Sequence, residues 1–150
     1  MTQLERVKQK YLNLHPTHGV EEKIIKEIED KLDIILPNDF KEIATYYDGY
    51  YDINNHSFFS FNPNVNDWNV INKTIVYRES DLKLPKNFLV IKEGDEDVIV
   101  LDTSDLINKV YWLSHADLYN LSNQKELLDD PMIFNSFGDF FEFILNETTD

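Results

Sequence analysis

The sequence predicts an α+β fold in which a central antiparallel sheet is flanked by N-terminal and C-terminal helices within a single domain. Two observations support this prediction. Short apolar segments suited to strands are grouped in the middle of the chain, and segments with the periodicity of amphipathic helices lie at both ends. A length of 150 residues suits one domain, and a hydrophobic content of 42% is sufficient for a packed core.

Helical periodicity first appears in two segments near the N-terminus. Residues 3–12 have the apolar spacing of a short helix that ends before Pro16. A stronger stripe covers residues 20–32, where apolar side chains recur at the spacing of a helix that buries one face. The stripe consists of Val20, Ile24, Ile25, Ile28 and Leu32.

An elbow and a second helix follow this stripe. Pro37 cannot continue the preceding helix and favours an extended backbone at Leu36. Asn38 is placed to cap the next helix, and Gly49 can adopt the left-handed conformation that ends it. The second apolar stripe consists of Phe40, Ile43, Ala44 and Tyr47. We expect Leu36, Pro37 and Gly49 to be structural, and the unit indicates a binding module because it contains no catalytic group.

The segment after Gly49 is predicted to lead into the sheet. A polar and aromatic loop at residues 50–57 precedes a short apolar strand at residues 58–61. Asp67 is placed to cap a helix that continues to Tyr77.

Three further strands are predicted at residues 87–91, 98–101 and 109–113. Residues 93–97 connect the first two as a β-hairpin with a longer turn. The unbroken apolar run at residues 98–101 predicts an inner strand that is covered on both faces.

The C-terminal part of the chain predicts a closing helix. Residues 115–131 are polar and show no pattern that assigns them. Ser136 and Asp139 resemble a capping box with Asp in place of the usual Glu or Gln. The wide stripe of the helix consists of Phe137, Phe140, Phe141, Ile144 and Leu145.

A series of short motifs lies in the helix–elbow–helix unit: Glu29, Leu32, Leu36-Pro37, Asp39-Phe40-Lys41 and Tyr47-Asp48-Gly49. This series resembles the signature of the SUKH superfamily. In that family an acidic helix leads to Leu-Pro, then to an Asp-aromatic-Lys helix start, and then to a helix stop that is usually Asn-Gly. Asp48 replaces the usual Asn, and either side chain can turn the chain locally. The predicted strands and closing helix match the family more weakly, so that the resemblance covers about residues 18–147.

The resemblance implies a function in toxin immunity. Bacterial SUKH proteins typically bind and neutralise a polymorphic toxin that the same cell makes. Many of these toxins carry a nuclease domain, so the expected partner is a cognate toxin with a basic, nuclease-type C-terminal domain. The resemblance also allows an alternative, an intracellular regulatory or scaffolding domain, because eukaryotic relatives act in cell-wall regulation and in substrate recognition by ubiquitin ligases.

The negative charge of the chain is concentrated in its C-terminal part. The net charge is −14. Residues 1–92 carry 14 acidic and 12 basic side chains, whereas residues 93–150 carry 14 acidic side chains and two lysines. Such a surface repels nucleic acid and anionic membranes and attracts a basic protein. An acidic surface that only improves solubility explains the same composition.

The composition also limits the compartment and the covalent chemistry. The chain has no cysteine, so it can form neither disulfides nor thiolate metal sites. The first residues lack the apolar core of a secretion signal, and the apolar runs are too short to cross a bilayer. We therefore expect a cytoplasmic protein with no membrane partner.

The histidines do not predict a catalytic or metal site. His15 and His18 flank Pro16 in a predicted loop without further ligands, so we expect two solvent-facing histidines rather than a metal site. His115 and Asp117 could orient an imidazole, but the chain offers neither a cysteine nor a Gly-x-Ser-x-Gly nucleophile. We expect no cofactor and no enzymatic activity.

Two acidic groups are candidates for carboxylate sites. Residues 93–97 lack the ligand spacing of an EF-hand and predict a solvated hairpin turn. Asp102 and Asp105 follow a strand, where such a pair can cap a turn or act in acid–base catalysis. Nothing in the sequence selects the catalytic interpretation.

Aromatic side chains beside carboxylates predict a protein-binding surface. Tyrosine and tryptophan supply a large rigid contact area with a hydrogen-bonding tip. In the alternative interpretation, Tyr50, Tyr51 and Trp68 pack against the edge of the sheet. The candidate partner-binding residues are Tyr50, Tyr51, Asp52, Asp67, Glu93, Asp95, Glu96 and Asp97.

Overall fold

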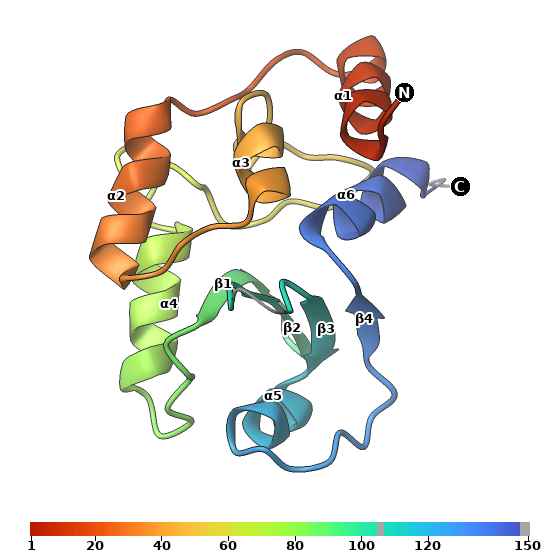
Figure 1. The fold of residues 1–150 in the computed structure, drawn as a ribbon. Coiled ribbons are helices and arrows are strands. Elements are labelled where there is room, and N and C mark those ends of the chain that lie inside the picture. Colours follow the sequence, from red (N-terminus) through yellow and green to blue (C-terminus); the bar gives the residue numbers. More distant parts are fainter. Residues whose placement is uncertain (105–106, 148–150) are drawn as a thin grey trace.

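A four-stranded antiparallel sheet with helices on both faces forms the centre of the fold (Figure 1). The computed structural model describes residues 1–104 and 107–147. The helices are α1 (Gln3–Leu14), α2 (Glu22–Leu32), α3 (Asn38–Ala44), α4 (Val70–Glu79), α5 (His115–Ser122) and α6 (Phe137–Asn146), and the strands are β1 (Phe88–Glu93), β2 (Asp97–Asp102), β3 (Val110–Ser114) and β4 (Met132–Phe134). The predicted α+β class is confirmed.

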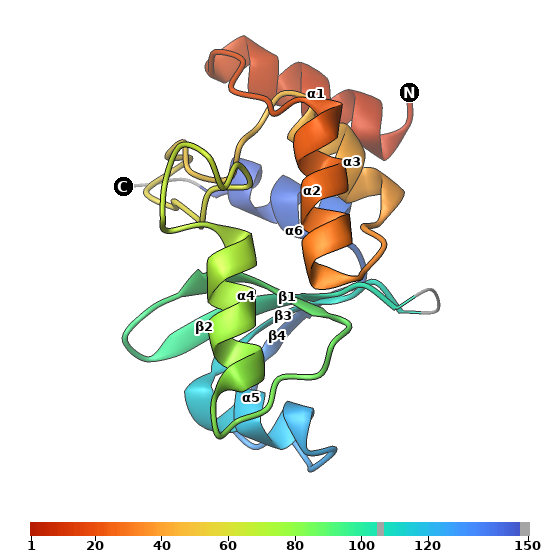
Figure 2. The same cartoon turned by 90° about the vertical axis from the view of Figure 1, so that its left-hand side faces the viewer.

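Helices lie on both faces of the sheet, with α5 alone on one of them among the described helices. Figures 1 and 2 show α1, α3 and α6 above the sheet and α5 below it, while α4 packs against β1. The strand order is β1-β2-β3-β4, and residues 98–101 are buried as predicted for an inner strand. The β1–β2 hairpin is confirmed, with residues 94–96 in its turn. Ser136 caps α6 by accepting the N–H of Asp139, as predicted.

The acidic and basic residues of the elbow between α2 and α3 form hydrogen bonds and an ion pair that hold the elbow in place. The Glu29 carboxylate accepts the N–H of Leu36 at 2.8 Å and lies 3.3 Å from Lys41 Nζ. The Asp39 carboxylate accepts the N–H of Gly138 at 2.8 Å, which joins α3 to the first turn of α6. These side chains therefore hold the elbow and the closing helix together.

The helix stop uses a carboxylate and a glycine. Oδ1 of Asp48 accepts the N–H groups of Tyr50 at 3.0 Å and Tyr51 at 2.9 Å, so Asp performs the local turn in place of Asn. Gly49 has φ +82°, and a Cβ at this position would lie 2.6 Å from the carbonyl oxygen of Phe59. Both the backbone conformation and the space require glycine.

Two predicted helix caps are wrong. Asn38 is the first residue of α3, and Pro37 occupies the N-cap position with extended backbone angles that suit it. Asn69 rather than Asp67 caps α4, by accepting the N–H of Asn72 at 2.8 Å. Asn69 is buried directly before the helix, whereas Asp67 lies exposed two residues earlier.

The predicted strand at residues 58–61 is also wrong. Its side chains are buried as the apolar pattern suggests. Its N–H groups donate in turn to carbonyl groups of the helix stop and of two other segments, so the segment forms no regular strand ladder with a single neighbour. The bonds run from Phe58 to the carbonyl of Gly49, from Phe59 to Ile91, from Ser60 to Trp68 and from Phe61 to Asp48.

The segment that showed no pattern contains α5 and a loop that leads to β4. Asp117 is buried, and its two carboxylate oxygens accept the N–H groups of Leu128 and Asp129, each at 2.8 Å. One aspartate therefore fixes a polar loop that has no apolar periodicity of its own. Asp105, considered with Asp102 as a carboxylate pair, lies outside the described residues.

Candidate protein-interaction surface

The loop between α3 and α4 and the turn of the β1–β2 hairpin lie on the same side of the molecule, at the left of Figure 2. Between the loop and β1 lies a hollow of about 350 Å³. We call it the aromatic hollow. It is lined by Tyr50, Ser57, Phe58, Phe59, Asn66, Trp68, Lys92 and Glu93.

Two exposed aromatic side chains form the walls of the aromatic hollow. Tyr50 is 54% exposed and Trp68 is 60% exposed, although both are large enough to be buried in a core. The Trp68 ring stacks on buried Phe59, with 6.2 Å between ring centroids. The Tyr50 backbone is fixed by Asp48 and by Ser57, whose hydroxyl donates to the Tyr50 carbonyl at 2.7 Å. The aromatic surface is therefore displayed on a held backbone, which lowers the entropic cost of binding.

Glu93 lines the aromatic hollow and pairs with Lys73 of α4. Lys73 Nζ lies 4.6 Å from the centroid of the Trp68 ring and 3.5 Å from the Glu93 carboxylate. Glu93 also accepts a hydrogen bond from the Tyr77 hydroxyl. Burial, with a further contribution from this bond, raises the pKa of Tyr77 well above its usual value. Glu93 is thus held by two side chains of α4.

Exposed carboxylates lie close in sequence to residues that line the aromatic hollow. Asp67 precedes Trp68, and Asp95 and Glu96 form the exposed turn of the hairpin. Asp97 has a different role, because its carboxylate accepts the indole N–H of Trp112 at 2.7 Å and it is only partly exposed. We call Asp67, Asp95 and Glu96 the acidic rim.

Tyr51 faces away from this surface. Its half-buried ring stacks on His18 with 4.4 Å between centroids, and its hydroxyl lies 3.3 Å from Nδ1 of His15. The prediction that His15 and His18 face solvent is therefore wrong, because both rings pack on Tyr51. Asp52 is exposed and accepts the N–H of Asn55 at 3.0 Å, which closes a local turn.

A known family of proteins matches the part of the chain that contains the elbow and the sheet. The model of the SMI1 / KNR4 family (SUKH-1) matches residues 19–143. The chain belongs to the SMI1 / KNR4 family (SUKH-1). No protein with a curated description matches it significantly. The matched range contains the whole aromatic hollow and acidic rim of this SUKH-1 chain.

Several residues of the aromatic hollow were not among the candidate residues. Phe59 lies in a segment that the sequence assigns to a strand, and Lys92 lies between the predicted strand at residues 87–91 and the predicted turn at residues 93–97. Trp68 is named in the sequence analysis only as a residue that packs on the sheet edge in the alternative interpretation. Lys73, which packs on the Trp68 ring from outside the hollow, has no signal in the sequence. The only available signal was the pairing of Trp68 with a preceding aspartate, because the residues meet through a loop whose course follows no repeating pattern.

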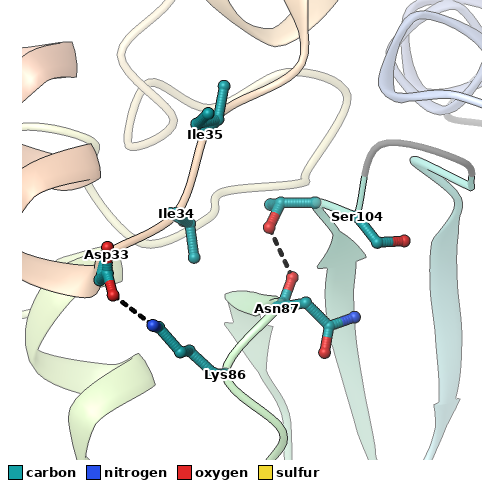
Figure 3. Close-up of a pocket in the computed structure, with 7 residues that line it drawn as sticks. Asp33, Ile34, Ile35, Lys86, Asn87 and Ser104 are labelled. Carbon is teal, nitrogen blue, oxygen red and sulfur yellow. Dashed lines mark hydrogen bonds and ion pairs between the residues drawn. The ribbon is translucent and has the colours of Figure 1, made fainter.

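A second hollow of the SUKH-1 chain, of about 520 Å³, lies between the end of α2 and the start of β1 (Figure 3). Lys86 and Asp33 form an ion pair across it, and this bond lowers the pKa of Asp33. The hydroxyl of Thr103 donates to the carbonyl of Asn87 at 2.7 Å. None of the candidate binding residues lines this hollow, and its two charges already neutralise each other.

Metal binding and membrane spanning are two other properties on which the described residues bear. Within residues 1–104 and 107–147, no group of three or more His, Asp or Glu side chains is arranged to hold a metal ion. Across the same residues, each helix is too short or too polar to span a membrane.

Proposed function

We propose that this SUKH-1 protein is an immunity protein that binds a cognate toxin domain and neutralises it by stoichiometric occlusion, without catalysis. Membership of the SUKH-1 family is consistent with this function. The observation that carries the proposal is the exposed aromatic pair, Tyr50 and Trp68, together with the exposed carboxylates of the acidic rim on the same segments of the chain. The partner in this proposal is a toxin with a basic, nuclease-type domain, and neutralisation takes place in the cytoplasm of the producing cell.

The physical basis of occlusion is the combination of aromatic anchors with carboxylates. Tryptophan and tyrosine provide most of the energy in many protein interfaces when they are enclosed by the partner. Carboxylates bind the arginine and lysine side chains that a nuclease uses to hold phosphates. They also attract the basic domain over a distance and so raise the association rate.

Two imidazoles take part in contacts within the fold. Nε2 of His115 lies 3.0 Å from the carbonyl oxygen of Gly94, and His56 pairs with Glu147. These contacts fasten the hairpin turn and the end of α6.

The test is co-expression of the full chain with the toxic domain encoded beside it, with growth and copurification as readouts. We expect rescue of growth and a one-to-one complex. Trp68→Ala should weaken the complex by about 2 kcal/mol, roughly 30-fold in Kd, because it removes a central aromatic contact. Tyr119→Ala is the matched control, since Tyr119 is an exposed aromatic residue of α5 on the opposite side of the sheet (Figure 1).

The outcomes separate the alternatives. If Trp68→Ala binds as tightly as the unmodified chain, or if both variants weaken the complex equally, the aromatic hollow is not the interface. If the toxin domain is neither neutralised nor bound, the immunity proposal is contradicted. The alternative of a regulatory or scaffolding domain then takes its place, with a host protein as the partner.

A further inference from the structure

The two edges of the sheet differ in how their backbone groups are covered. At the β1 edge, the Thr74 hydroxyl accepts the N–H of Val90 at 2.9 Å, and the N–H of Phe59 donates to the carbonyl of Ile91 at 2.9 Å. At the other edge, β4 pairs with β3 only, within residues 1–104 and 107–147. Figure 1 shows no described helix or strand beyond β4. One edge is covered, and the other presents backbone groups to solvent.

The open edge carries exposed apolar side chains. Met132 and Ile133 are adjacent residues of β4, so they point to opposite faces of the sheet, yet they are 40% and 46% exposed. Leu128, in the loop just before β4, is 72% exposed. Apolar surface is therefore exposed on both faces of this edge strand.

Carboxylates lie beside this apolar surface. Glu126, Asp129 and Asp130 are exposed in the loop that enters β4. The loop is held in place, because the Asp117 carboxylate accepts the N–H groups of Leu128 and Asp129. The backbone of the loop is therefore held at Leu128 and Asp129, just before the strand begins.

We infer that the β4 edge binds a lysine- or arginine-rich extended segment of a partner protein, which adds a fifth strand to the sheet. Strand addition uses main-chain hydrogen bonds for affinity and alternate side chains for specificity. The apolar side chains of the segment would pack on Met132 and Ile133, and its cations would face Glu126 and Asp130.

Charge decides between this occupant and a second copy of the chain. Each copy of this chain carries a net charge of −14, and the repulsion between two such copies opposes their association through β4. A basic strand converts the carboxylates of the loop into attractive contacts. The β4 edge is a contact separate from the aromatic hollow, and the inference does not depend on the partner being a toxin.

The test uses the full isotope-labelled chain and a capped synthetic peptide, Lys-Val-Lys-Val-Lys-Val-Lys, followed by NMR. We expect amide shifts centred on residues 126–134. The double variant Glu126→Gln with Asp130→Asn should raise the Kd about fivefold, since two exposed charge contacts are lost. The matched control is Glu22→Gln with Asp30→Asn, which removes two exposed carboxylates from α2 and should leave the Kd unchanged.

A second peptide distinguishes strand addition from charge attraction. N-methylation of alternate residues keeps every charge but blocks the hydrogen bonds of one edge, and it should abolish binding. Equal binding of the methylated peptide overturns the inference, as does the absence of shifts at millimolar concentration of the unmodified peptide. Concentration-dependent dimerisation of the free chain through residues 132–134 also overturns it, because the occupant is then a second copy.

Discussion

The replacement Glu29→Ala tests whether the family signature encodes the elbow. Glu29 is 17% exposed in its side chain, accepts the Leu36 N–H at 2.8 Å and pairs with Lys41 at 3.3 Å. Loss of a charge-assisted hydrogen bond to a partly buried amide costs about 2 kcal/mol. The lost contact with Lys41, which is 38% exposed, adds less than about 1 kcal/mol because solvent screens it. We expect a loss of about 2 kcal/mol in the free energy of unfolding.

Urea denaturation followed by circular dichroism measures this loss, and the Tm should fall by about 6 °C for a chain of this size. Glu27→Ala is the matched control, because Glu27 lies on the same helix and forms only a surface ion pair with Lys31. It should cost about 0.5 kcal/mol or less. Glu29→Gln keeps an acceptor oxygen without the charge, so an intermediate loss is expected. If Glu29→Ala and Glu27→Ala are equally stable, the carboxylate does not hold the elbow.

Three further predictions follow from the structure. Gly49→Ala should destabilise the fold by about 3 kcal/mol in urea, through left-handed strain and a backbone clash; a loss near zero would contradict the helix stop. The hydrogen bond from the Leu128 N–H, with those from Asp129 and Asn120, lowers the pKa of Asp117. The stabilising effect of the ionised Asp117 should therefore disappear as pH falls below 3.8 and through the lowered pKa, with loss of hydrogen-exchange protection at the Leu128 and Asp129 amides. Asp117→Asn should lose that pH dependence. Replacing both Asp95 and Glu96 with Lys should slow toxin association about tenfold and weaken its salt dependence at unchanged Tm, as stopped-flow kinetics would show; unchanged kinetics would remove the turn from the interface.

The helices and the inner strand were predictable because their signals are local. The apolar stripe before the elbow and the buried run at residues 98–101 each report a repeating environment along one element. The run at residues 58–61 gave a false strand, because burial without a ladder leaves the same apolar pattern as burial within one. The loop fixed by Asp117 gave no signal at all, since one carboxylate can order a polar segment whatever its periodicity.

The candidate surface was predictable only in part. The signal of the acidic hairpin turn is local, and the prediction of a solvated turn is confirmed for exposed Asp95 and Glu96. Asp97 was grouped with it, but its bond to Trp112 depends on the register of β2 and β3, which residue types do not reveal. Tyr50 and Tyr51 are adjacent and chemically alike, yet one lines the aromatic hollow and the other packs on His18. Which of the two is available depends on the course of the loop.

The signature residues and the surface residues differ in where their polar groups are used. The carboxylates of Glu29, Asp39 and Asp48 each accept backbone N–H groups within the chain, so they specify the fold and have little capacity left for a partner. The rings of Tyr50 and Trp68 remain exposed on a backbone that is already fixed. A fold held by one set of residues leaves the other set free to vary, and function then depends on the site rather than on the fold. We therefore expect partner specificity in this family to follow the residues of the hollow and its rim, while the elbow stays the same.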